Sequence, residues 1–297
     1  MKLKSDELTL ELKELGIPLP IDNGVEILDA PRIENCYPKR ARNSHKGTYG
    51  SCNIVAGSEK YAGAAVLSLN GALRSGCGYV KLTSCEYVKS LLIPKLPQVI
   101  YLDEPDLTSQ AIAIGMGMVA TQDTYDAVKN LINNYSGSLV IDADGLNALS
   151  KFGVNILKEK TCKVILTPHL KEFSRLTKLN IEEILKNPVE ISKEFSKEYG
   201  VTLLLKGAAS IICEGERVAI NTRGTTALSK GGSGDILSGF MCGCLARGLA
   251  PFDAASCAAY TLGVAAEIAS KEKTDYCATA HDIIKSLHLS VKRLTLN

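Results

Sequence analysis

The sequence has almost no net charge, because 34 Lys and Arg residues are matched by 32 Asp and Glu residues in a chain of 297. Nucleic-acid-binding proteins usually carry a strong basic excess, so this balance argues against a nucleic-acid partner. Disordered chains combine low hydrophobicity with high net charge, whereas 45% of the residues here are hydrophobic. The composition therefore predicts a globular protein that binds no nucleic acid.

The sequence also lacks a segment suited to secretion or to a membrane. Its first 16 residues, MKLKSDELTLELKELG, carry charges throughout and have no continuous apolar stretch typical of a signal peptide. No window approaches the roughly 18 uncharged apolar residues that a transmembrane helix needs. We therefore expect no membrane partner and a cytoplasmic location.

Ten cysteines are present, but they form no CxxC pair and no dense segment. Cys242 and Cys244 are two residues apart on a predicted helix, so their side chains diverge and cannot bind one metal ion together. Scattered cysteines in a chain this rich in apolar residues behave as small buried hydrophobes. We expect reduced, mostly buried thiols and no metal site built from cysteine.

From Gly50 onward, short apolar runs alternate with longer segments of helical periodicity, among them residues 62–75, 181–198, 234–247 and 251–271. This alternation predicts an α/β fold, with a doubly wound, mainly parallel central sheet and helices on both faces. No change in composition divides the chain further. Residues 1–40 are therefore predicted to be an N-terminal extension, and residues 41–290 a single domain.

A glycine-rich loop joins a predicted strand to a predicted helix within NTRGTTALSKGGSGDILSGFMCGCLARG, residues 221–248. Glycines let backbone N–H groups approach phosphate oxygens, and a helix N-terminus adds partial positive charge. Asp235 in the first helical turn could take a proton from a hydroxyl that attacks phosphorus, or it could cap the helix. Lys206, at the end of an apolar strand, could meet a phosphate or mark a solvated strand end. Neither a Walker A loop nor GxGxxG is present.

Polar residues also follow two other predicted strands. Asp142, Asp144 and Asn147 could bind substrate, organise water around Mg²⁺, or hold their loop through Asx turns. His169 follows a Thr-Pro pair, where a lone histidine is more often structural than catalytic, and Glu172 could cap a helix or approach the substrate and metal. Since the carboxyl ends of parallel strands line the ligand crevice, these are candidate site residues.

Five separated motifs follow one another along the chain: SHKGTYGSCNIVAGSEKYAGAAVLSLNGALRSGCGYV at 44–80, AIGMGM at 113–118, LVIDADGLNAL at 139–149, ILTPHLKEF at 165–173, and KGAAS at 206–210 with TTALSKGGSGD at 225–235. With these motifs in this order, the chain resembles the ADP- or ATP-dependent NAD(P)H-hydrate dehydratases of the ribokinase-like superfamily over roughly residues 38 to 285. The resemblance implies a ribokinase-like fold and a dehydratase domain over residues 41–290.

The resemblance also implies roles for individual residues. Asp235 would be the catalytic residue, and it would contact the hydrated nicotinamide nucleotide together with Ala64, Gly117, His169 and Glu172. The adenine nucleotide would be bound by Lys206, Gly207, Ala208, Ala209, Ser210, Thr225, Thr226, Ala227, Leu228, Ser229, Lys230, Gly231, Gly232, Ser233 and Gly234. At residues 115–119 this chain reads GMGMV where the family more usually has GPGLG, so Val119 stands where the last glycine would be.

The implied activity is repair of a nicotinamide cofactor. ADP or ATP, with Mg²⁺, would phosphorylate the ring hydroxyl of the S-epimer of hydrated NADH or NADPH (NADHX or NADPHX), and elimination of phosphate would restore NAD(P)H. The resemblance also implies a homo-oligomer, commonly a tetramer. The residues before the first motif are too few for the epimerase domain that many relatives carry, so we expect a separate epimerase chain.

Two other functions fit parts of the same pattern. A ribokinase-like kinase of a small vitamin precursor would share the glycine loop and Asp235, although the motifs at 44–80 and 165–173 favour the dehydratase. A non-catalytic nucleotide sensor would keep the fold, but a carboxylate beside phosphates brings no evident benefit to simple binding. These two alternatives are left to experiment.

Overall fold

The computed structural model describes residues 11–18 and 24–295. Its sheet has ten strands in the order β1-β10-β9-β8-β7-β6-β5-β2-β3-β4, and in this described part β9 alone runs antiparallel to its neighbours. The strands are β1 (Val25–Ile27), β2 (Ser51–Val55), β3 (Tyr79–Thr83), β4 (Ile100–Leu102), β5 (Ala111–Ile114), β6 (Ser138–Ile141), β7 (Lys163–Leu166), β8 (Thr202–Leu205), β9 (Ser210–Glu214) and β10 (Arg217–Asn221). The predicted mainly parallel sheet is confirmed.

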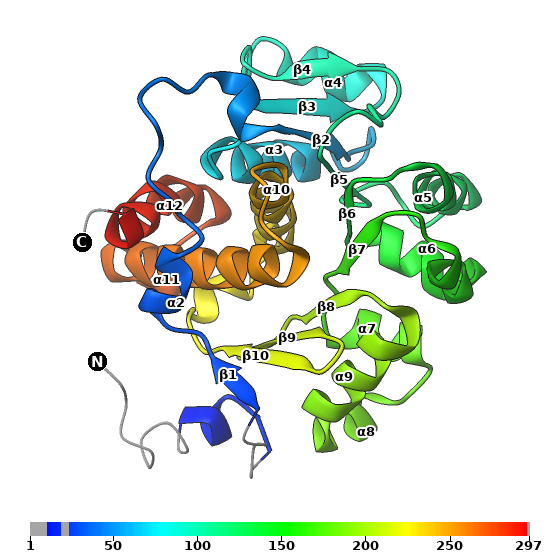
Figure 1. The fold of residues 1–297 in the computed structure, drawn as a ribbon, viewed down its shortest axis with the longest axis vertical. Helices are drawn as coiled ribbons and strands as arrows, with labels where there is room; N and C mark the ends of the chain where they lie inside the picture. The colour runs from blue at the N-terminus through cyan, green and yellow to red at the C-terminus, as the bar shows by residue number, and fades with distance from the viewer. Residues whose placement is uncertain (1–10, 19–23, 296–297) are drawn as a thin grey trace.

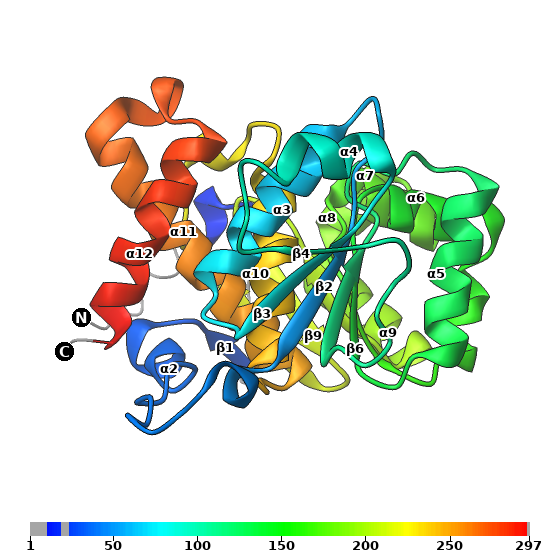
Figure 2. The same cartoon turned by 90° about the horizontal axis from the view of Figure 1, so that it is seen from above.

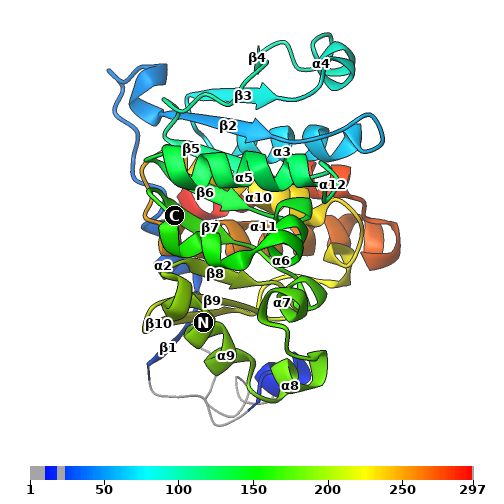
Figure 3. The same cartoon turned by 90° about the vertical axis from the view of Figure 1, so that its right-hand side faces the viewer.

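Helices cover both faces of this sheet (Figures 1 and 3). The α-helices are α2 (Ala30–Glu34), α3 (Ala62–Arg74), α4 (Glu86–Leu92), α5 (Gln122–Asn134), α6 (Asp144–Phe152), α7 (Leu170–Thr177), α8 (Ile181–Lys186), α9 (Pro188–Tyr199), α10 (Ser233–Ala246), α11 (Pro251–Cys277) and α12 (Ala280–Thr295). Three short 3₁₀ helices are η1 (Lys46–Tyr49), η2 (Val154–Glu159) and η3 (Thr226–Leu228).

Side chains alternate between two cores, as expected for a strand buried on both faces. On β5, Ala111 and Ala113 face the core shared with α3, α10, α11 and α12. Ile112 and Ile114 of the same strand face the core shared with α5 to α9. The predicted doubly wound architecture is therefore confirmed.

The helices α3 and α10 lie next to each other on one face of the sheet (Figure 2), and their backbones approach closely. A Cβ built on Gly239 would lie 1.9 Å from the carbonyl oxygen of Ser68, and one on Gly243 would lie 1.9 Å from Oγ of Ser75. Only glycine permits such an approach. Gly239 lies against Ser68, and Gly243 lies against Ser75, so the residue numbers of the two helices increase in the same direction. The helices are therefore parallel, and their N-termini meet at one edge of the sheet.

The predicted single helix over 181–198 is wrong. The structure has α8 and α9 instead, separated at Asn187, whose φ of −142° and ψ of 58° are not helical. Pro188 is the first residue of α9, and a proline disfavours helical geometry in the residue before it. The break therefore follows from a single proline.

Part of the predicted N-terminal extension, residues 1–10 and 19–23, lies outside the described residues. Strand β1 of this extension pairs in parallel with β10 and completes one edge of the sheet. Helix α2 begins at the N-cap Asp29, whose side chain accepts a hydrogen bond from the backbone N–H of Arg32, and it packs against α11 and α12. The described part of the extension thus belongs to the same folded body as the predicted domain.

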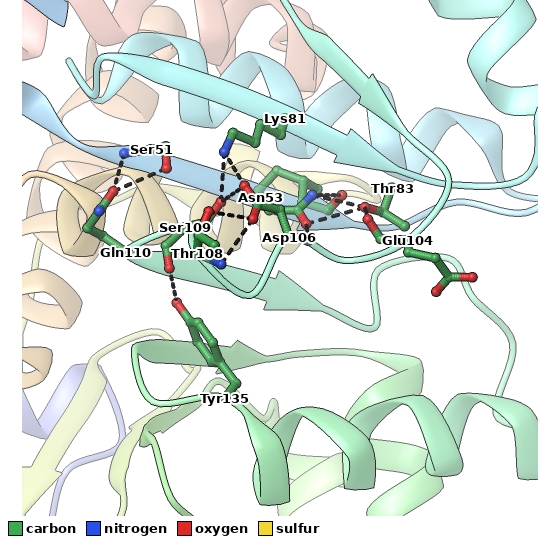
Figure 4. A network of polar contacts seen from close by, with 11 residues as sticks. Ser51, Asn53, Lys81, Thr83, Glu104, Asp106, Thr108, Ser109, Gln110 and Tyr135 are labelled. Atoms are coloured by element: carbon green, nitrogen blue, oxygen red, sulfur yellow. Dashed lines mark hydrogen bonds and ion pairs between the residues drawn. The ribbon is translucent and has the colours of Figure 1, made fainter. Parts of the chain in front are cut away.

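A polar network covers β2 and β3 on the face opposite α3 (Figure 4). Asn53 of β2 is fully buried; its amide donates to Oγ1 of Thr83 over 3.2 Å, and its Oδ1 accepts from the backbone N–H of Asp106 over 2.8 Å. Lys81 of β3 forms an ion pair with Asp106. The segment between β4 and β5 is therefore fixed to the sheet by satisfied polar groups instead of apolar packing.

None of the described helices is long and apolar enough to cross a membrane. All ten cysteines are free thiols, and the prediction that most of them are buried is confirmed, with Cys85 and Cys277 the exposed exceptions.

Candidate functional site

The order in which successive strands are added across the sheet reverses at β2. The chain passes from β2 to β3 and β4, and then returns to β5 on the other side of β2. Ligands of open α/β sheets bind outside the carboxyl ends of the strands at such a point. Ala64 follows β2 in the first turn of α3, and Gly117 follows β5. A Cβ on Gly117 would lie 2.7 Å from Cβ of Ala64, so these two predicted substrate residues are in contact.

A strained turn follows β6 and directs two carboxylates. Ala143 has a φ of 47° and a ψ of −116°, a conformation that is costly for a residue with a side chain and that concentrates at functional sites. The turn is held on both sides, because the backbone N–H groups of Asp142 and Asp144 donate to the carbonyls of Ile114 and Gly115. In the structure, the carboxylates of Asp142 and Asp144 bond to the distant residues Lys206 and Val119, and their contact with substrate or Mg²⁺ stays a prediction.

Asp144 supports a second strained position. Its Oδ2 accepts a hydrogen bond of 2.8 Å from the backbone N–H of Val119, whose φ is 67°. A β-branched residue is a genuine outlier in this left-handed region, which favours glycine. The glycine that the sequence resemblance led us to expect at this position would adopt the same φ without this strain.

Lys206 lies among several carboxylates at the end of β8. Its Nζ is 2.8 Å from Oδ1 of Asp142 and 4.0 Å from Oε2 of Glu172. Burial disfavours the charged lysine, but the two carboxylates outweigh this effect and raise the pKa of Lys206. The other oxygen of Asp142 accepts a hydrogen bond from Oγ of Ser238, on α10, over 2.7 Å. This network therefore links β6, β8, α7 and α10 at the edge of the sheet.

Asp235 faces the same network from the first turn of α10. The N-cap residue of that helix is Gly232, with a φ of 96°, so Asp235 is not the capping residue. Burial and the neighbouring Asp142 raise the pKa of Asp235 to about 7, although Lys206 lowers it. A carboxylate with this pKa is well suited to accept a proton near neutral pH.

His169 and Glu172 form a capping box at the start of α7. Nδ1 of His169 accepts from the backbone N–H groups of Lys171 and Glu172, so the neutral ring carries its proton on Nε2. Burial and Lys206 lower the pKa of His169, which favours this neutral form. The half-exposed ring of His169 is thus part of a helix cap, and its Nε2 lies 3.5 Å from Oε1 of Glu172.

Glu172 is buried, and its Oε2 accepts a hydrogen bond of 2.8 Å from the backbone N–H of His169. Burial raises the pKa of Glu172 to about 7, with Lys206 opposing the shift and Asp142 adding to it. Two carboxyl groups that titrate near neutrality, Glu172 and Asp235, thus flank one lysine.

A cavity of about 500 Å³ opens beside this network, within the size range of ligand pockets. Most of the predicted nucleotide-binding residues line it: Lys206, Gly207, Ala208, Ser210, Thr225, Thr226, Leu228, Ser229, Ser233 and Gly234. The predicted residues Ala209 and Ala227 lie buried in the two cores instead. Lys230, Gly231 and Gly232 do not line the cavity either, so their direct contact with a nucleotide stays a prediction.

The sequence interpretation missed part of the cavity wall, which includes Leu15, Asn221, Arg223, Gly224, Leu237, Ala259 and Leu262. Leu237, Ala259 and Leu262 are apolar positions on α10 and α11, and no pattern in the sequence separates them from ordinary core residues. Asn221 is the last residue of β10 and Arg223 follows it by two positions, so a search of that strand end would have found them.

The structure combines a mainly parallel sheet, a glycine loop at a helix N-terminus, a cavity beside this loop, and the carboxyl group of Asp235 directly after Gly234. These features define an α/β protein with a ribokinase-like fold. A ribokinase-like superfamily protein from Enterococcus faecalis V583 has the same fold, with a TM-score of 0.83 over 94% of this chain and all of that one, at 22% identity.

Comparison of sequences narrows this class to one family. A profile described as NAD(P)H-hydrate dehydratase matches residues 52–289. The ADP-dependent (S)-NAD(P)H-hydrate dehydratase of Bacillus subtilis is 34% identical, over 84% of this chain and 92% of that protein. This chain therefore belongs to the NAD(P)H-hydrate dehydratase family.

Further relatives agree with this assignment. A crystal structure of the ADP/ATP-dependent NAD(P)H-hydrate dehydratase from Bacillus subtilis, co-crystallised with ATP/Mg²⁺, has a TM-score of 0.83 and 31% identity, over 92% of this chain and 100% of that one. A bifunctional NAD(P)H-hydrate repair enzyme of Moorella thermoacetica is 30% identical over 96% of this chain. The chain spans only 58% of that enzyme and 49% of its counterpart from Hyperthermus butylicus.

Proposed function

We propose that this protein uses ADP or ATP to dehydrate the S-epimer of hydrated NADH or NADPH and so returns the damaged cofactor to NAD(P)H. The observation that carries the proposal is the environment of Asp235. This carboxyl directly follows Gly234, which lines the cavity. Its pKa is raised to about 7, and it lies close to the ion pair of Lys206 and Asp142. Membership in the dehydratase family supports the choice of reaction.

In the proposed reaction, the ionised Asp235 takes the proton from the hydroxyl group of the hydrated nicotinamide ring. The hydroxyl oxygen attacks the terminal phosphorus of the nucleotide, and the bond from that phosphorus to its bridging oxygen breaks, which releases AMP from ADP or ADP from ATP. The backbone N–H groups at the start of α10 and the cation of Lys206 stabilise the charge that develops on the phosphoryl oxygens.

Elimination follows from the phosphorylated ring. Phosphate is a better leaving group than hydroxide, and the lone pair of the ring nitrogen assists its departure. The ring carbon beside the vacated position then loses a proton, so that the net change is loss of water and restoration of the reduced ring. Ala64 and Gly117, in contact at the crevice, and Nε2 of His169 are the proposed contacts of this ring.

The donor set at this edge fits a magnesium ion held jointly with a nucleotide. In the described part of the chain, no three metal-ligating side chains are grouped to hold an ion by themselves. Mg²⁺ bound to phosphates needs only one or two carboxylates, however, and Asp142 and Asp144, which lie close enough to Asp235 to raise its pKa, would supply them. When bound, the ion would neutralise phosphate charge.

The proposal extends to partners and location. We infer that the substrates are an adenine nucleotide and NADHX or NADPHX, that the protein acts in the cytoplasm as a homo-oligomer, and that a separate epimerase chain converts the other hydrate epimer. The substrates, the homo-oligomer and the epimerase rest on the family resemblance, whereas the location rests on the lack of a secretory or membrane segment in the sequence. Size-exclusion chromatography with light scattering tests the oligomeric state.

The decisive experiment incubates the purified protein with enzymatically hydrated NADPH and either ADP or ATP. Return of the reduced-nicotinamide absorbance, together with stoichiometric phosphate, is the expected result. A control without nucleotide should show neither. Failure of the reduced-nicotinamide absorbance to return with either nucleotide would refute the proposal.

A vitamin-precursor kinase is the competing catalytic function, because it uses the same loop and the same aspartate. A parallel incubation with a hydroxymethyl vitamin precursor and ATP should yield no phosphorylated product. A nucleotide sensor would bind ADP or ATP by calorimetry but turn over neither substrate. The three functions therefore give three different sets of products.

A further inference from the structure

The side chain of Lys230, in the middle of the glycine loop, points away from the cavity and toward the end of α11. Its Nζ donates to the backbone carbonyls of Asp275, Tyr276 and Ala278 over 2.8, 2.7 and 2.6 Å. An ammonium group has three donors and no acceptor. All three donors are used here, so none is left for a phosphate oxygen.

These carbonyls are accessible because α11 breaks near its end. Thr274 has a φ of 68° and a ψ of 159°, which interrupts the helix one residue before Asp275. Carbonyls at a helix C-terminus have no partner within the helix and attract positive charge. Lys230 therefore acts as a cap for the junction between α11 and α12, although 45 residues separate it from the first carbonyl.

A second set of contacts holds the start of the same loop to α11. The hydroxyl groups of Thr225 and Ser270 are 2.8 Å apart, and the backbone N–H of Gly224 donates to Oε1 of Glu267 over 3.1 Å. Thr225 also lines the cavity, as does Ser233 at the far end of the loop. Oγ of Ser233 donates to the carbonyl of Lys230 over 3.2 Å. One side of the loop is thus bonded to α11 while the other side faces the cavity.

We propose that Lys230 is a positioning residue, which holds the glycine loop against the α11–α12 junction so that the loop's N–H groups are preorganised for the nucleotide phosphates. The proposal rests on the proposed function only in taking the ligand to be an adenine nucleotide. The backbone carbonyls of Asp275, Tyr276 and Ala278 would then contribute to nucleotide binding through Lys230, without touching the nucleotide themselves. Preorganised donors avoid the cost of ordering a loop during binding.

The test compares Lys230→Met with Lys230→Arg, and uses Lys271→Met as the matched control, since Lys271 is an exposed lysine on α11. We expect Lys230→Met to raise the Kd for ADP and ATP, measured by calorimetry, by about tenfold, and to speed amide hydrogen exchange in residues 231–235. The kcat at saturating nucleotide should fall as well, because the displaced N–H groups also stabilise the charge on the phosphoryl oxygens in the proposed reaction. Lys271→Met should behave as wild type in every measurement.

Lys230→Arg separates positioning from direct binding. A planar guanidinium cannot direct three donors at three converging carbonyls, but it binds phosphate at least as well as an ammonium does. Positioning therefore predicts that Lys230→Arg is impaired like Lys230→Met. Restored nucleotide affinity in Lys230→Arg would identify a direct phosphate ligand and overturn the proposal.

Two further results would also overturn the proposal. One is a lower unfolding temperature of Lys230→Met with unchanged nucleotide affinity, which would assign the lysine to stability alone. The other is unchanged amide exchange in residues 231–235. Neither readout requires turnover, so absence of dehydratase activity in the wild type would refute the proposed function and leave this test intact.

Discussion

Replacing Asp235 by asparagine should produce two opposite effects, a loss of turnover and a gain of stability. Burial and the neighbouring Asp142 raise the pKa of Asp235 from 3.8 to about 7. Asparagine keeps the size of the side chain but can neither accept the substrate proton nor carry a charge. A general base contributes roughly 10²- to 10⁴-fold to a rate, so we expect kcat to fall by that factor while nucleotide affinity stays nearly unchanged.

The pH dependence of the wild type follows from the same pKa. With the ionised carboxylate as the active form, about a tenth of the protein is active at pH 6 and about nine tenths at pH 8. The kcat/KM for the hydrate should therefore rise about tenfold between these values, with its midpoint near pH 7. Initial rates of absorbance recovery at saturating ADP measure it, and a flat profile would contradict the assignment of Asp235 as base.

The stability effect has a definite sign. A carboxyl whose pKa is higher in the folded than in the unfolded state destabilises the fold when ionised; the penalty is absent below pH 3.8 and complete above about pH 7. A shift of this size corresponds to at most about 4 kcal/mol, and partial exposure of the side chain reduces it to roughly 1–3 kcal/mol. Urea unfolding should show Asp235→Asn to be more stable than wild type at pH 8, with the difference vanishing near pH 4.

Asp123→Asn is the matched control, because Asp123 is an exposed aspartate in the first turn of α5. It removes the same charge from a helix N-terminus and should change stability by less than about 1 kcal/mol in the opposite direction. Wild-type turnover by Asp235→Asn, or a loss of stability at pH 8, would refute the reasoning.

Three further substitutions test the surroundings of this carboxyl. Lys206→Met removes the cation that lowers the pKa of Asp235, so the midpoint of the pH–rate profile should move upward and the KM for nucleotide should rise about tenfold or more. Gly117→Ala adds a methyl group 2.7 Å from Cβ of Ala64 at a φ of 67°, and should cost about 1–3 kcal/mol in urea unfolding and raise the KM for the hydrate. Val119→Gly relieves a left-handed valine and should raise the free energy of unfolding by about 0.5–1 kcal/mol; a decrease would show that the side chain contributes more than its strain costs.

Local patterns were enough to predict much of the fold. The alternation of apolar runs and helical segments predicted the central strands β5 to β8, because these are buried on both faces and consist mostly of apolar residues. The edge strands β1 and β4 were missed, because each has only three residues and partly exposed side chains. The break at Pro188 was readable in the sequence, as a proline inside a helical pattern restricts the residue before it.

The sequence by itself determined the glycine loop and the position of Asp235 at the start of its helix, because these features lie within a few consecutive residues. Only the tertiary structure decided which distant groups meet there. Asp142 and Lys206 are 64 residues apart, yet their ion pair and the burial around it help to set the pKa of Asp235. Likewise, a lysine inside a phosphate-binding motif was predicted to bind nucleotide, but its three donors are used by carbonyls that only the fold brings within reach. Burial and long-range contact are properties of the folded chain, and these properties determine what each residue of the motif can do.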